Sequence, residues 1–126
     1  PDRVQPDDDA AYLFLGLAYT SLGVHAKAEA AYRRAIALSP TNPHAYNYLG
    51  LVYHQERRSG QALAAYRQAI VQAPDYAVAY VNLAASHEAL GQTEQALTAY
   101  RQALQRDANL AAVQERIDAL GKKSAK

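Results

Sequence analysis

The sequence predicts an all-α protein in which three helix–turn–helix repeats stack side by side and one further helix caps the stack. Three observations support this prediction. The segment AYRRAI at 31–36 returns as AYRQAI at 65–70 and as AYRQAL at 99–104, so the chain repeats itself every 34 residues. Apolar residues within each repeat recur at intervals of three and four, which is the spacing of one helix face. Glycine and proline stand where such helices would end.

Aligning the chain on this interval places similar residues at equivalent positions, or columns, in every repeat. The columns are Tyr12, Tyr46 and Tyr80; Leu15, Leu49 and Leu83; Gly16, Gly50 and Ala84; Tyr19, Tyr53 and His87; Ala28, Ala62 and Ala96; Tyr32, Tyr66 and Tyr100; Ala35, Ala69 and Ala103; and Pro40, Pro74 and Ala108. The predicted segments are a linker at 1–8, repeats at 9–42, 43–76 and 77–110, a capping helix at 111–121 and a tail at 122–126.

The first repeat begins with the acidic run 7–9, which is favourably placed at a helix N-terminus. Gly23 suits the left-handed residue that ends its first helix, and Pro40 stops its second helix. The first helix is unusually apolar around Phe14, whereas an end repeat normally presents a polar outer face. We therefore expect either a preceding repeat or self-association through this helix.

The second repeat opens with Asn42 and Pro43, a helix cap followed by proline in the first turn. Its glycine is displaced to Gly60, which suggests that its first helix runs longer or turns differently. Proline at 74 stops its second helix, as in the first repeat.

The third repeat replaces the Gly, Tyr and Pro of three columns by Ala84, His87 and Ala108, which suggests a looser unit. After it, a stripe at helical spacing predicts an amphipathic helix that ends at Gly121 and covers the open face of the third repeat. The stripe consists of Leu110, Val113, Ile117 and Leu120.

Gly16 and Gly50 fall inside predicted helices, where glycine costs about 1 kcal/mol relative to alanine. A glycine at such a position is explained most simply if a second helix comes very close. Ala28 and Ala62 would supply the matching small surface, with the tyrosine columns on either side.

The columns resemble the tetratricopeptide repeat pattern, W-x2-L-G-x2-Y…A-x3-F…P, over residues 9–110, with tyrosine in place of Trp and Phe. The resemblance implies a right-handed superhelical α-solenoid whose concave surface, lined by the first helix of every pair, binds an extended peptide or a partner helix. Leucine or valine anchors would supply affinity there, and polar residues would fix the register.

Helical spacing selects the residues of this expected groove. In order, they are Ala10, Leu13, Leu17 and Thr20; His44, Asn47, Leu51 and His54; and Val78, Val81, Ala85 and Glu88, flanked by Tyr48 and Asn82. All of these except Ala10 and Thr20 are candidate partner-binding residues. Eight of the ten tyrosines fall in core columns; Tyr48 is the stronger binding candidate of the two outside them, and Tyr76 the weaker.

Composition argues against several other functions. Thirteen basic and 12 acidic residues give a net charge of +1 without a clustered basic face, which argues against nucleic-acid binding. The apolar run 10–19 is too short to insert into a membrane as a spanning helix. There is no cysteine, and no HExxH, phosphate loop or GxSxG motif, so we expect no catalytic site, metal or cofactor.

Family members that grip the C-terminal carboxylate of chaperones use lysines, asparagines and an arginine on the concave face. This chain has Leu13, Leu17, Tyr48, Val78 and Asn82 there, so we expect no binding of such tails. Two alternatives to the interaction module remain: a self-assembling homo-oligomeric scaffold, and an accessory repeat domain of a larger enzyme such as a glycosyltransferase.

Overall fold

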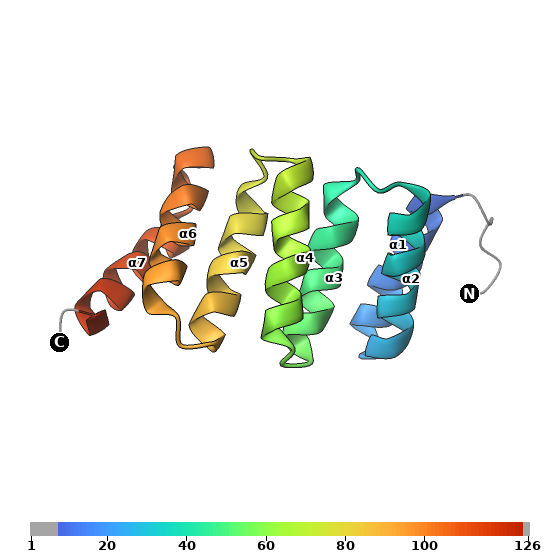
Figure 1. Ribbon diagram of the computed structural model, residues 1–126, viewed down its shortest axis with the longest axis horizontal. Helices are drawn as coiled ribbons and strands as arrows, with labels where there is room; N and C mark the ends of the chain where they lie inside the picture. Colours follow the sequence, from blue (N-terminus) through green and yellow to red (C-terminus); the bar gives the residue numbers. More distant parts are fainter. Residues whose placement is uncertain (1–7, 125–126) are drawn as a thin grey trace.

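The computed structural model describes residues 8–124 and contains seven α-helices and no strand within that range (Figure 1). The predicted linker at 1–8, apart from Asp8, and residues 125–126 of the predicted tail lie outside the described residues. The helices are α1 (Asp9–Ser21), α2 (His25–Leu38), α3 (Pro43–Gln55), α4 (Ser59–Gln72), α5 (Ala77–Ala89), α6 (Thr93–Arg106) and α7 (Ala111–Ser124).

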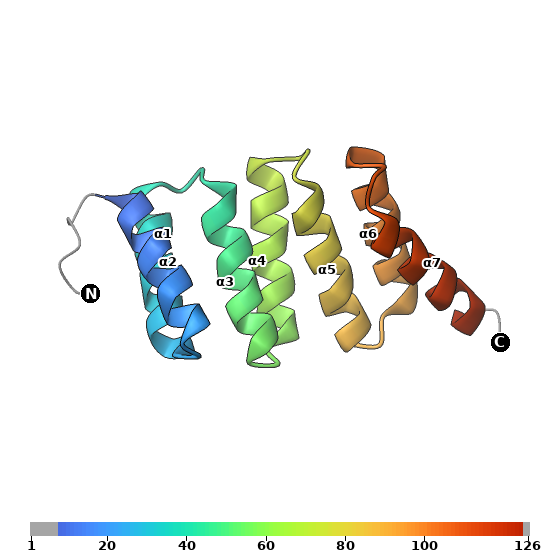
Figure 2. The same cartoon turned by 180° about the vertical axis from the view of Figure 1, so that it is seen from behind.

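Consecutive helices pair as α1–α2, α3–α4 and α5–α6, and the pairs stack in chain order with α7 at the C-terminal end (Figures 1 and 2). α3 contacts both α1 and α5, so the first helices of the pairs share one face of the stack. Figure 2 shows this side, with α1 in front of α2 and α7 in front of α6. The predicted fold, an all-α solenoid of three helix pairs with a capping helix, is confirmed.

Side chains cap the first helices of two pairs. The Asp8 carboxylate accepts a hydrogen bond from the Ala11 N–H at 3.0 Å. The Asn42 side chain accepts one from the His44 N–H at 3.0 Å, and Pro43 occupies the first turn. Each cap satisfies a backbone donor that has no partner inside its helix.

The turn between the helices has the same form in all three pairs. Gly23 and Gly91 have φ of 74° and 73°, and Arg57, one repeat from each, has φ of 62°. α3 is 13 residues long, like α1 and α5, so the expectation of a longer helix or a different turn in the second repeat is wrong. Packing of the pair fixes this turn even though a left-handed non-glycine residue costs about 1–2 kcal/mol.

The third pair keeps the helix lengths of the other two, 13 and 14 residues, despite its three substitutions. His87 is buried, and its Nδ1 lies 2.7 Å from the Gln92 side-chain oxygen. α6 ends at Arg106 although Ala108 stands in the proline column. The Asp107 carboxylate supports the chain beyond this end by accepting a hydrogen bond from the Asn109 N–H at 3.0 Å.

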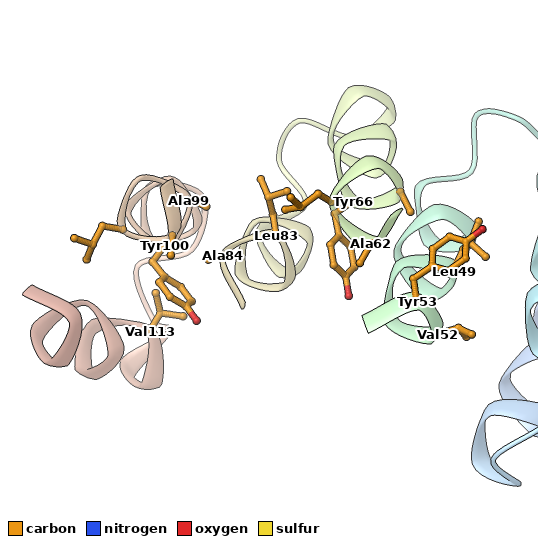
Figure 3. Packing of buried hydrophobic residues seen from close by; sticks show 14 of the residues in the cluster. Leu49, Val52, Tyr53, Ala62, Tyr66, Leu83, Ala84, Ala99, Tyr100 and Val113 are labelled. Atoms are coloured by element: carbon orange, nitrogen blue, oxygen red, sulfur yellow. The ribbon is translucent and has the colours of Figure 1, made fainter. Parts of the chain in front are cut away.

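The core lies between the helices of each pair and between neighbouring pairs (Figure 3). Ala28 and Ala62 are fully buried, as a close approach of helices requires. The atoms nearest Gly16 and Gly50, however, belong to tyrosine rings. A Cβ placed on Gly50 would lie 2.5 Å from the Tyr66 ring, and one on Gly16 would lie 2.4 Å from the equivalent ring of Tyr32. The glycines therefore make room for a ring rather than for an alanine.

α7 covers α6 as predicted, with Val113 and Leu120 buried. It continues through Gly121 to Ser124, so the predicted helix end at 121 is wrong. Glycine lowers helix stability without forbidding a helix, and no atom lies within 4 Å of an added Cβ at Gly121 to enforce a turn. None of the helices in the described part of the chain is long and apolar enough to cross a membrane.

Candidate functional site

The face shared by α1, α3 and α5, which we call the first-helix face, carries the predicted groove residues. Leu13 and Leu17 of α1 meet His44 and Tyr48 of α3 around a hollow of about 240 Å³. Ala10 and Phe14 complete its lining, and we call it the apolar hollow. The structure thus brings four predicted residues together, although they come from different repeats.

Phe14 is the clearest addition to the predicted set. Its side chain is 71% exposed, which is unusual for a large aromatic residue, and it lines the apolar hollow. Helical spacing left it off the stripe because it lies one residue beyond Leu13. Its signal in the sequence was the excess of apolar residues on the first helix.

Packing fixes the Tyr48 side chain in the lining of the hollow. Its ring stacks on the buried Tyr32, with centroids 5.8 Å apart and planes inclined by 27°. Burial raises the pKa of the Tyr32 hydroxyl, which lies 3.0 Å from the Thr20 hydroxyl. The wall that α3 contributes is therefore already ordered in the free protein.

A chain of polar side chains crosses the middle of the first-helix face. His44 Nδ1 lies 3.2 Å from the Tyr76 hydroxyl, and the Asn47 amide donates to that hydroxyl at 3.1 Å. The Asn82 amide in turn donates to Asn47 Oδ1 at 2.8 Å. Burial raises the pKa of Tyr76, so this hydroxyl remains protonated and can donate as well as accept.

This network changes the role of Asn47. Its side chain is 2% exposed, so it cannot touch a partner, and its prediction as a contact residue is wrong. It instead holds Asn82 and Tyr76 in place. Helical spacing identified the correct face but not the depth of the side chain, which neighbouring helices determine. Tyr76, the weaker tyrosine candidate, proves to be a central member of the network.

At the far end of the face, Glu88 is engaged by the protein itself. Arg116 of α7 donates through Nε to Glu88 Oε1 at 2.8 Å, and the Tyr100 hydroxyl donates to Oε2. The hydrogen bond from Arg116 holds the pKa of Glu88 below its ordinary value of 4.5. The acid expected at the edge of the groove therefore joins α7 to the third pair.

The remaining predicted residues differ in their access to solvent. Val78 is 47% exposed, whereas Leu51, Val81 and Ala85 are half-buried, with Leu51 and Val81 packed on the core. The half-buried His54 has Nδ1 3.3 Å from the Ser86 hydroxyl. Residues 8–124 contain no cluster of three or more histidine or acidic side chains suited to a metal ion.

Comparison with known families gives three matches that together span residues 16–110. Models of the tetratricopeptide repeat match residues 43–76 and 77–110, and a TPR repeat model matches residues 16–56. No curated protein matches the chain.

Solved structures of similar shape include the first TPR of Spaghetti (RPAP3) bound to the HSP90 peptide SRMEEVD. It is 19% identical, each chain covers 100% of the other, and the TM-score is 0.91. MamA is 22% identical over 96% of this chain and 71% of its own, with a TM-score of 0.90. The TPR2B domain of yeast Sti1, in complex with pHsp70, is 22% identical over 93% of this chain and 95% of its own, with a TM-score of 0.83.

These structural similarities show a common fold, but at such low sequence identity they do not identify a ligand of this chain. The fold agrees with the repeat matches and with the packing of a tyrosine ring against glycine described above. The chain belongs to the tetratricopeptide repeat family.

Proposed function

We propose that this protein is an interaction module that binds an extended peptide or a helix along its first-helix face. The single observation that carries the proposal is the apolar hollow, where the exposed Phe14 and the half-buried Leu13 and Leu17 lie beside Tyr48. Apolar side chains grouped in this way favour contact with another apolar surface. A leucine or phenylalanine of the partner would be the anchor, since fully burying such a side chain contributes about 1.5–3 kcal/mol.

The walls of the hollow are ordered before a partner arrives. Tyr48 is stacked on Tyr32, and His44 lies within hydrogen-bond distance of Tyr76. A preorganised surface avoids the cost of ordering side chains on binding, which is about 0.5–1.5 kcal/mol for each one immobilised.

The polar network would set the position of the ligand. Asn82 uses its amide N–H to bond Asn47, and its half-buried side chain leaves a carbonyl oxygen able to accept from a ligand N–H. His44 is exposed, and within residues 8–124 its ring forms a hydrogen bond only through Nδ1. Val78, on the same helix as Asn82, would add an apolar contact beyond the network.

The peptides bound by RPAP3 and Sti1 support a peptide-binding role in general but not the same ligand. Gripping a terminal carboxylate needs cations that donate charge-assisted hydrogen bonds. The positions at which family members place such groups hold no cation here; they are Leu13, Leu17, Tyr48, Val78 and Asn82. We therefore propose that acidic chaperone tails are not ligands of this protein.

Selection from a random peptide library displayed on phage tests the proposal. The intact chain should select peptides that share a large apolar residue. Leu17→Arg should weaken their binding by about tenfold or more, since it replaces an apolar wall by a charge. Val71→Arg is the matched control, because Val71 is 67% exposed on α4, away from the first-helix face. Equal binding by both variants, or no selected peptide, would contradict the proposal.

Self-association is a second candidate, favoured by the 71% exposure of Phe14. Two copies could each insert this ring into the hollow of the other. Light scattering distinguishes the candidates, because self-association makes the apparent mass rise with concentration and Phe14→Ser abolishes the rise. A constant monomer mass would eliminate this candidate.

A further inference from the structure

The end of the stack formed by α1 and α2 carries a second apolar surface, distinct from the first-helix face. A hollow of about 280 Å³ lies there, and we call the surface that lines it the end surface. It consists of Tyr12, Leu15, Tyr19, Lys27, Ala30 and Ala31. Leu15 and Tyr19 are only half-buried, whereas their equivalents Leu49 and Tyr53 are 6% and 4% exposed. The first pair thus exposes side chains that the second pair buries.

The second pair shows what covers these positions. α2 of the preceding pair packs there. The Arg33 guanidinium donates a hydrogen bond to the Tyr53 hydroxyl, and this hydroxyl donates one to the Glu29 carboxylate at 3.4 Å. Arg58 of the second pair donates to the same Glu29 at 3.1 Å. A hollow of about 270 Å³, lined by residues of α3 and α4 that include Leu49 and Tyr53, remains in the second pair, so the covering helix does not fill this groove.

Two cationic side chains, Lys27 and Arg34, lie beside the tyrosine rings of the end surface. The Lys27 ammonium lies 5.6 Å from the Tyr19 ring centroid, and the Arg34 guanidinium lies 5.8 Å from that of Tyr12. Neither cation forms an ion pair with any acid among residues 8–124. Lys27 thus provides beside Tyr19 the kind of cation that Arg58 provides beside Tyr53.

We propose that the end surface docks an acidic amphipathic helix of a partner, which covers Leu15 and Tyr19 as α2 covers Leu49 and Tyr53. The surface continues the pair-to-pair interface of the stack, and one carboxylate of the docked helix would lie at Lys27, as Glu29 lies at Arg58. A second carboxylate two turns along would lie at Arg34.

A second copy of this chain is a poor occupant for two reasons. The helices that could cover the surface in the same register are α2, α4 and α6, and each is already covered by α3, α5 and α7, respectively. Two end surfaces placed face to face would bring Lys27 and Arg34 of each copy against an equally positive surface. Like charges at an interface oppose association.

The probe is a stapled helical peptide based on residues 25–38 in which Lys27, Arg33 and Arg34 are replaced by glutamine, so that the peptide is acidic and keeps Glu29 on its docking face. NMR titration of the intact chain should give saturable shifts at the amides of Leu15 and Tyr19. Lys27→Glu in the chain, or Glu29→Lys in the peptide, should each weaken binding by roughly fivefold. Combining the two changes should restore most of the affinity, because the charges are then exchanged rather than removed.

Lys122→Glu on α7, at the opposite end of the stack, is the control and should leave binding unchanged. The proposal is overturned if the peptide gives no saturable shifts, or if the shifts fall on the first-helix face. It is also overturned if the charge exchange restores nothing, or if sedimentation shows a dimer that Leu15→Lys dissociates. Saturable shifts at Leu15 and Tyr19 support docking at the end surface whether or not the apolar hollow binds a peptide.

Discussion

Replacing Gly50 by alanine tests the packing of a helix pair most sharply. Helix propensity alone predicts stabilisation by about 1 kcal/mol, because glycine is the poorer helix former. The structure predicts the opposite sign. The new Cβ would lie 2.5, 2.7 and 2.9 Å from three carbon atoms of the Tyr66 ring, far inside normal van der Waals contact at about 3.5–4.0 Å.

The magnitude follows from how little the ring can move. Tyr66 is 1% exposed and enclosed by the core, so relief requires displacement of its neighbours as well. Overpacking of this kind typically costs about 1–3 kcal/mol, and the short contacts favour the upper end. Subtracting the propensity gain leaves a net loss of about 2 kcal/mol in the free energy of unfolding. The third pair has alanine at the equivalent position, where Ala84 is fully buried and Tyr100 is 5% exposed.

Urea unfolding followed by far-UV circular dichroism measures the effect. Gly50→Ala should lower the midpoint by about 1 M. Gly60→Ala is the matched control, since no atom lies within 4 Å of its added Cβ, and it should leave the midpoint equal or higher. In a Tyr66→Leu background, Gly50→Ala should cost little. A Gly50→Ala protein as stable as the parent would refute the packing argument.

Three further outcomes are expected. Arg57→Gly should stabilise the protein by about 1 kcal/mol, because it removes a left-handed non-glycine residue, and an unchanged urea midpoint would count against this. Glu88→Gln should destabilise the protein at neutral pH. Because the hydrogen bond from Arg116 lowers the Glu88 pKa, the ionised carboxylate contributes to the free energy of unfolding above about pH 4.5. This contribution is lost as pH falls through the lowered pKa, so the effect of the substitution should shrink in acid. The peptide SRMEEVD should give no saturable fluorescence anisotropy change, and submicromolar binding lost on Asn82→Ala would prove this wrong.

The repeat period predicted the fold closely because it reflects a physical unit. One helix pair cannot bury both of its faces, so the same core columns return every time a pair is added. α1, α3 and α5 accordingly begin at Asp9, Pro43 and Ala77, one period apart. The amphipathic pattern of the last helix likewise predicted that Val113 and Leu120 would be buried.

The features that escaped sequence reasoning depend on contacts between helices. Spacing along one helix shows which side chains share a face, but not that Asn47 lies beneath Tyr76 and Asn82. Glu88 looked like a free acid because its partner Arg116 lies on a helix outside the repeats. The turn at Arg57 was missed because glycine is the usual residue there, and packing of the pair outweighs that preference.

The most direct test of the central claim is to locate a bound peptide on the protein. Methyl NMR of the intact chain, saturated with the tightest peptide from the library, should show intermolecular nuclear Overhauser effects between an apolar peptide side chain and the methyls of Leu13 and Leu17. Effects confined to residues of α2, α4 and α6, with none at these two leucines, would contradict it.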